Sequence, residues 1–137
     1  MKFTQLFIVS LLFLITFVYS QGPPNIKLTI NSTEIINGTA LEASIRFSHY
    51  TIIGTSDVII FKYFFDIEDP KSNDTNYWAI SKIPMTQKMI PFTDIESTIV
   101  NLTLGEHFVI VNVAKAPLQY GAPFDVNSNE VWFNVTN

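Results

Sequence analysis

Cysteine is absent from this 137-residue sequence. The absence excludes a disulfide scaffold, a thiolate metal site and a cysteine nucleophile. Basic residues are also few, since 8 Lys and Arg stand against 12 Asp and Glu, for a formal net charge of -4. A nucleic-acid surface needs clustered positive charge, so we predict no nucleic-acid partner.

Catalytic and metal-binding signatures are scarce as well. The only histidines are His49 and His107, whereas a metal site needs three or four converging ligands. No G-x-S-x-G elbow, phosphate loop, HExxH motif or glycine-rich dinucleotide turn occurs. Carboxylate pairs for glycoside hydrolysis need a cleft, and a chain of this length leaves little room for one. We therefore expect a protein without cofactor, metal or catalytic residues, and keep a small carbohydrate-active enzyme as a distant alternative.

One long hydrophobic run is present, and it begins a few residues after Met1 and Lys2. Residues 6–19 are almost entirely Leu, Phe, Ile and Val, and Ser20 and then Pro23 follow them. A basic start, a short apolar core and a small residue before the cut are typical of a secretory signal peptide. An uncleaved anchor would need roughly 20 apolar residues. The sequence thus predicts a signal peptide at 1–20 and a secreted, extracellular chain at 21–137 without a transmembrane segment.

Apolar and polar residues alternate with a period of two through the mature chain, as in half-buried strands. Turn signals such as Asn37-Gly38 and Gly121-Ala122-Pro123 separate the segments. The pattern predicts an all-β fold, an antiparallel sandwich or barrel. The expected strands cover residues 26–30, 41–47, 58–67, 77–81, 100–104, 109–113 and 129–136.

The stretch from residue 102 to 113 reads Leu102-x-Leu104-Gly105-x-His107-x-Val109-x-Val111-x-Val113. It resembles the E–F hairpin of immunoglobulin-like sandwiches, in particular fibronectin type III and PKD-like extracellular repeats. The segment 129–136 resembles their closing G strand. The resemblance implies an immunoglobulin-like antiparallel β-sandwich of about seven strands spanning 21–137. His107 stands at the tyrosine-corner position, and the Cys…Trp…Cys pattern of antibody domains is absent.

Five N-x-[ST] motifs predict N-glycosylation, and none has proline in the middle. Three of their asparagines fall on the water-facing phase of expected strands and two fall in turns. Trp132 lies two residues before the last of them and so shares its face. We hypothesise that the first sugar on Asn134 rests on the Trp132 indole, which would explain why this tryptophan points outward. The five acceptors are Asn31, Asn37, Asn73, Asn101 and Asn134.

The segment 58–67 carries large apolar residues on both faces, so we expect a central strand with its second face covered by a loop or serving as a binding patch. Exposed aromatic and apolar groups engage sugars or partner proteins. The candidate contact residues are Tyr77, Trp78, Val58, Ile60 and Phe64. The acidic loop 66–74 offers oxygen ligands of the kind calcium prefers, without EF-hand spacing, and we leave calcium binding open there.

These features favour a secreted, N-glycosylated β-sandwich that acts as a non-catalytic extracellular binding or adhesion module, with a protein or a carbohydrate as partner. The alternative is a structural component of an extracellular coat or matrix. The fold alone does not distinguish a binding module from a structural component, because sandwiches host many unrelated functions.

Overall fold

The computed structural model describes residues 25–48, 57–85, 92–115 and 124–137. The predicted signal peptide at 1–20 lies outside the described residues. Within these ranges the chain is all-β, and no helix there is long and apolar enough to cross a membrane. The nine strands are β1 (Asn25–Ile30), β2 (Glu34–Ile36), β3 (Ala40–Ser48), β4 (Asp57–Phe65), β5 (Ala79–Met85), β6 (Phe92–Ile99), β7 (Gly105–Lys115), β8 (Phe124–Asn127) and β9 (Val131–Thr136).

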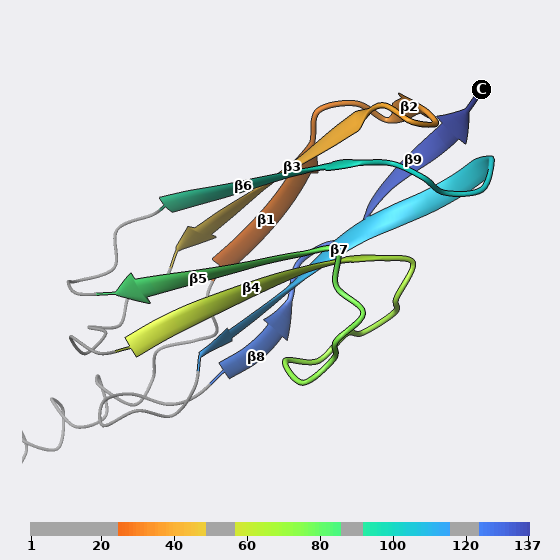
Figure 1. Cartoon of the computed structure of the whole chain (residues 1–137). Coiled ribbons are helices and arrows are strands. Elements are labelled where there is room, and N and C mark those ends of the chain that lie inside the picture. The colour runs from red at the N-terminus through yellow and green to blue at the C-terminus, as the bar shows by residue number, and fades with distance from the viewer. Residues whose placement is uncertain (1–24, 49–56, 86–91, 116–123) are drawn as a thin grey trace, which may run out of the picture.

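The strands form two sheets that face each other (Figure 1). The smaller sheet has the order β1-β3-β6, and both of its pairings are antiparallel. The larger sheet has the order β2-β9-β7-β4-β5, with β8 also paired to β7. Its β2–β9 pairing is parallel, and its other pairings are antiparallel.

β8 and β9 act as two halves of one broken strand along β7. β8 pairs with residues 112–115 of β7, and β9 pairs with residues 105–109. Ser128 bridges the break, because its amide donates to the Val111 carbonyl at 2.9 Å and its hydroxyl accepts from the Val111 amide at 3.0 Å. A side chain therefore replaces a backbone group in the ladder.

The main core lies between the sheets and follows directly from the period-two pattern. In β3 the side chains of Leu41, Ala43, Ile45 and Phe47 are all 0% exposed. Alternate residues of β4 and β7 complete the core from the opposite sheet. Burying each large side chain contributes about 1.5–3 kcal/mol, so this layer dominates the stability of the fold.

Strand β6 was not predicted from the sequence. We predicted a strand at 100–104, and this was wrong, because β6 ends at Ile99 and residues 100–104 connect it to β7. Ile95 and Ile99 point outward and are each 55% exposed, whereas Asp94 lies on the half-buried phase. Inward polar residues are a common feature of sheet edges, where they oppose pairing with another chain.

The number of strands also exceeds the expected seven or so. The short β2 and β8 have three and four residues, too few for a periodic signal. The prediction of a central strand at 58–67 is confirmed, because β4 lies between β5 and β7. The expected edge strand at 77–81 corresponds to β5, which ends the order of its sheet.

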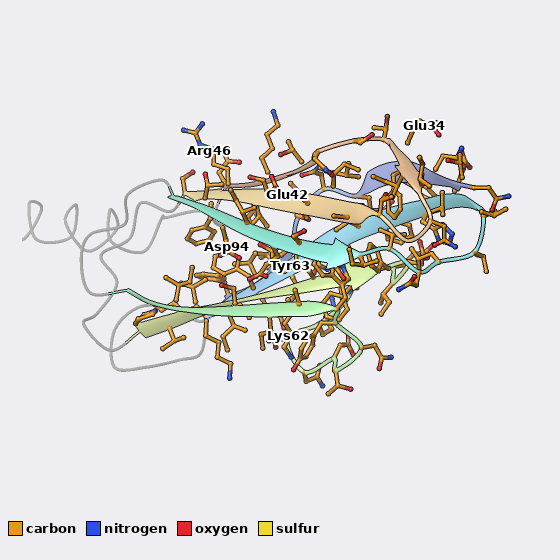
Figure 2. All side chains as sticks on the ribbon, turned by 45° about the horizontal axis from the view of Figure 1, so that its top comes forward. Glu34, Glu42, Arg46, Lys62, Tyr63 and Asp94 are labelled. Atoms are coloured by element: carbon orange, nitrogen blue, oxygen red, sulfur yellow. The ribbon has the colours of Figure 1, made fainter. Side chains whose placement is uncertain are left out.

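Hydrogen bonds close the side of the sandwich between β5 and β6. The hydroxyl of Tyr63, on β4, donates to Asp94 Oδ2 on β6 at 2.6 Å, and the Ser81 hydroxyl donates to Asp94 Oδ1 at 3.1 Å. Figure 2 shows Tyr63 and Asp94 close together between the two sheets. Burial, reinforced by Asp94, raises the pKa of Tyr63 well above its usual range. Burial also raises the pKa of Glu96, and the charge of Asp94 adds to this shift.

The Tyr63→Phe substitution tests this closure, because it removes the donor to Asp94 and leaves the ring in place. We expect a loss of about 1.5–3 kcal/mol in the free energy of unfolding, the usual value of a hydrogen bond to a charged group. Urea denaturation measures it. Tyr77→Phe is the matched control and should cost less than about 0.5 kcal/mol. Equal losses in the two variants would contradict the proposed closure.

Candidate functional site

The connection between β4 and β5, residues 66–78, folds back over the outer face of the larger sheet (Figure 1). It covers a second, smaller core formed by Phe64 (0% exposed), Phe108 (6%) and Ile110 (4%). Ile67 and Tyr77 of the connection pack against these three side chains. The loop therefore covers the second apolar face of β4 around Phe64.

Lys62 anchors the middle of this connection from the sheet. Its Nζ donates to the carbonyl oxygens of Ser72 at 2.6 Å and Asp74 at 2.8 Å. The same Nζ lies 5.0 Å from the centroid of the Tyr77 ring, a cation–π distance. Figure 2 shows Lys62 on the side of the sheet where the connection lies. One lysine thus holds both the backbone and an aromatic side chain of the loop.

Asn112 and Asp125 anchor the loop on the β7–β8 side. The buried Asn112 Nδ2 donates to the Pro70 carbonyl at 3.2 Å and to Asp125 Oδ1 at 2.6 Å. Asp125 Oδ2 accepts from the Ser72 amide at 3.0 Å. Burial raises the pKa of Asp125, but the hydrogen bonds from Asn112 and Ser72 outweigh it and hold the pKa below its ordinary value.

The loop carboxylates serve mainly as acceptors for the protein's own donors. Asp69 binds Lys71 Nζ at 2.8 Å and accepts from Asn127 Nδ2 at 2.9 Å, and Asp74 Oδ2 accepts from the Lys71 amide at 2.7 Å. Asp66 and Asp69 have φ values of 53° and 50°, a left-handed conformation that aspartate tolerates. Among the described residues, no three His, Cys, Asp or Glu side chains gather as a metal site would require.

His107 ties the start of the loop to the β6–β7 connection. Its Nδ1 lies 2.6 Å from Asp66 Oδ2 and its Nε2 lies 2.8 Å from the Thr103 carbonyl. Both partners are acceptors, so only the doubly protonated ring donates to each of them. Asp66 Oδ1 accepts from the Phe108 amide at 2.9 Å, which fixes the carboxylate. Burial lowers the pKa of His107, but the hydrogen bonds to Asp66 and Thr103 outweigh it and raise the pKa above its ordinary value.

The structure separates the five predicted contact residues. Phe64 and Tyr77 lie on the outer face of the larger sheet, with their rings edge to face at 6.4 Å. Trp78 packs against the main core, with ring centroids 5.2 Å from Tyr63 and 5.3 Å from Phe65. Because Trp78 faces the main core and Phe64 is fully buried beneath the loop, the five residues do not form one exposed surface.

Val58 and Ile60 remain half-buried on the outer face, beside β5. The register pairs Val58 with Pro84, Ile60 with Lys82 and Lys62 with Ile80, which places these partners on the same face. The sequence analysis missed the three β5 residues, although the alternation of β5 places them together. We call the surface formed by Val58, Ile60, Ile80, Lys82 and Pro84 the β4–β5 face.

The predicted glycosylation asparagines lie at the surface. Asn31, Asn37, Asn73 and Asn101 are exposed, and Asn134 is partly exposed. Asn31 directly follows β1 and Asn101 lies between β6 and β7, so of the three expected strand positions only Asn134 is within a strand. The geometry is compatible with modification at each position, and their occupancy stays a prediction.

Comparisons with known proteins find likeness in structure alone. No family model matches the sequence, and no curated protein matches it. The C-terminal domain of Wzt is similar over 85% of this chain and 75% of that chain, with 11% identity and a TM-score of 0.53. A β-glucosidase from Listeria innocua in complex with glucose is similar over 83% of this chain and 16% of that chain, with 16% identity and a TM-score of 0.46. The likeness to the Wzt domain shows a shared all-β fold.

The His107 contacts predict a pH dependence of stability. A histidine pKa that is raised on folding stabilises the protein fully below the unfolded value of about 6.5, and this contribution is lost as the pH rises through the folded value. The melting temperature of the wild type should therefore exceed that of His107→Gln most at acidic pH. Circular dichroism melts between pH 5.5 and 9 measure the difference. A difference that does not change with pH would contradict this assignment.

Proposed function

We propose that this protein is a secreted, N-glycosylated, immunoglobulin-like β-sandwich, of the fibronectin type III or PKD-like kind, that acts as a non-catalytic extracellular binding or adhesion module. The strand order supports this fold, because it has a three-stranded sheet facing a larger sheet whose central strands are β7 and β4. The hydrogen bond of His107 to the Thr103 carbonyl supports it further, since it resembles the bond of a tyrosine corner.

The β4–β5 face carries the binding proposal. It combines the half-buried apolar residues Val58, Ile60 and Ile80 with the exposed Lys82 on an edge strand. All five of its residues lie on two paired strands, so the surface is formed before a partner binds and little conformational entropy is lost on association.

The chemistry of this face favours a protein partner over a carbohydrate. A sugar needs an open aromatic ring on which to stack. Lys62 lies over the Tyr77 ring, and Phe64 packs edge to face against it. Aliphatic side chains next to a lysine instead suit a partner protein with an apolar surface and nearby acidic groups.

Charge reversal tests the proposal. Purified glycosylated protein should bind a cell surface, and Lys82→Glu should weaken the binding roughly tenfold, because it opposes an acidic partner. Lys27→Glu, on the exposed phase of β1 in the other sheet, is the matched control and should leave binding unchanged. Flow cytometry across a panel of cell types measures both variants. Binding to no cell type, or equal loss in the two variants, would overturn this assignment and favour a structural role in an extracellular coat.

A further inference from the structure

Exposed apolar side chains accompany the predicted glycosylation sites. Among the described residues, five large apolar side chains are exposed, and four of them lie within three positions of an acceptor asparagine. Ile36 precedes Asn37, Ile99 and Leu104 flank Asn101, and Trp132 lies two residues before Asn134, with exposures between 53% and 55%.

Backbone hydrogen bonds bring three of these acceptors to one end of the sandwich. The Asn37 amide donates to the Thr136 carbonyl at 2.9 Å, which joins the Asn37 turn to the strand of Asn134. The Gly38 amide donates to the Val100 carbonyl at 2.8 Å, which joins the same turn to the residue before Asn101. Figure 1 shows β2, the end of β9 and the β6–β7 connection together at this end.

Trp132 gives the clearest geometry. Its ring packs against Phe108 at 4.9 Å between centroids, and its Nε1 donates to Glu130 at 3.2 Å, yet the residue is 54% exposed. Asn134 projects from the same face of β9, about 7 Å further along at the usual rise per residue. That separation matches the reach of one sugar ring from the asparagine to the indole.

A carboxylate on the neighbouring strand β2 holds the Asn134 amide. Its Nδ2 donates to Glu34 Oε2 at 3.1 Å. Glycosylation joins Nδ2 to the anomeric carbon of a lipid-linked sugar diphosphate, with loss of one amide proton and departure of the diphosphate. One N–H remains after attachment, so Glu34 can still hold the linkage in place.

We propose that N-glycans on Asn37, Asn101 and Asn134 pack on the exposed apolar side chains around them and shield this end of the sandwich, with the first sugar on Asn134 stacking on the Trp132 indole. The proposal rests on the glycosylation in the proposed function and assigns the glycans a structural role. The C–H face of a pyranose packs well on apolar surface. Without such cover, apolar residues beside the edge strand β2 would favour self-association.

The remaining acceptors provide the control. Neither Asn31 nor Asn73 has an exposed large apolar residue within three positions among the described residues. The test therefore compares the triple variant Asn37→Gln, Asn101→Gln, Asn134→Gln with the double variant Asn31→Gln, Asn73→Gln. The wild type and both variants are to be expressed in eukaryotic cells as secreted proteins. Glycopeptide mass spectrometry then establishes which sites are occupied in the wild type.

We expect the triple variant to bind more of the hydrophobic dye bis-ANS and to self-associate in sedimentation velocity, whereas the double variant behaves like the wild type. If the triple variant is not secreted, enzymatic removal of glycans from the folded double variant strips only positions 37, 101 and 134, and this protein is then compared before and after the treatment. Replacing the apolar residues by serine in the triple variant should restore the monomer. Unoccupied sites at 37, 101 and 134, or equal dye binding and sedimentation in the two variants, would overturn the proposal.

Tryptophan fluorescence tests the Asn134 contact separately. The protein has two tryptophans, and Trp78 packs against the main core. Asn134→Gln should raise acrylamide quenching roughly twofold, because a sugar on the open face of the Trp132 ring covers much of its exposed area. Asn101→Gln is the control and should leave quenching unchanged, and no increase for Asn134→Gln would overturn the stacking. The quenching measurement involves neither Lys82 nor a partner protein, so its result is independent of the cell-binding test.

Discussion

The two apolar faces of β4 set the constraint on which the rest of the structure depends. Its inner face needs the opposite sheet, which supplies the main core, and its outer face needs a second cover around Phe64. Residues 66–78 provide this cover and so fix the path of the chain between β4 and β5. The anchors from Lys62, Asn112 and His107 follow from that need, because a polar loop stays on a sheet only when its backbone groups are satisfied.

This arrangement also explains how an acidic chain uses its carboxylates. Asp66, Asp69 and Asp125 accept hydrogen bonds from amides or side chains of the described loop and its neighbours. Asp94 does the same between the sheets, where it receives the Tyr63 hydroxyl. These acids stabilise the connections of the fold, while the β4–β5 face presents lysine and aliphatic groups at the surface. The division between structural acids and a basic, apolar surface underlies the proposed binding role.

The sequence predicts best where side chains alternate over a buried face. β3 alternates over its whole length, and β4 is apolar on both faces, so both strands and the central place of β4 were predictable. β6 was not predictable, because its alternation is inverted. Asp94 points inward to accept a hydrogen bond from a residue 31 positions away, and Ile95 points outward into solvent. Tyr77 and Trp78 were grouped as one patch, yet neighbouring residues in an extended chain point to opposite sides. The histidine corner depends on Asp66, 41 positions from His107, which no local pattern reveals.

The parallel pairing of β2 with β9 has a consequence for how the protein is made. The pairing joins residues a hundred positions apart, as the contact between Asn134 and Glu34 shows. Such long-range contacts form late, because the loop between them must close before any bond is gained. Under the proposed glycosylation, Asn37 is therefore accessible to the glycosylation machinery during synthesis, well before its turn docks on β9. The order of translation thus allows the proposed sugars to be added before these distant segments of the chain come together.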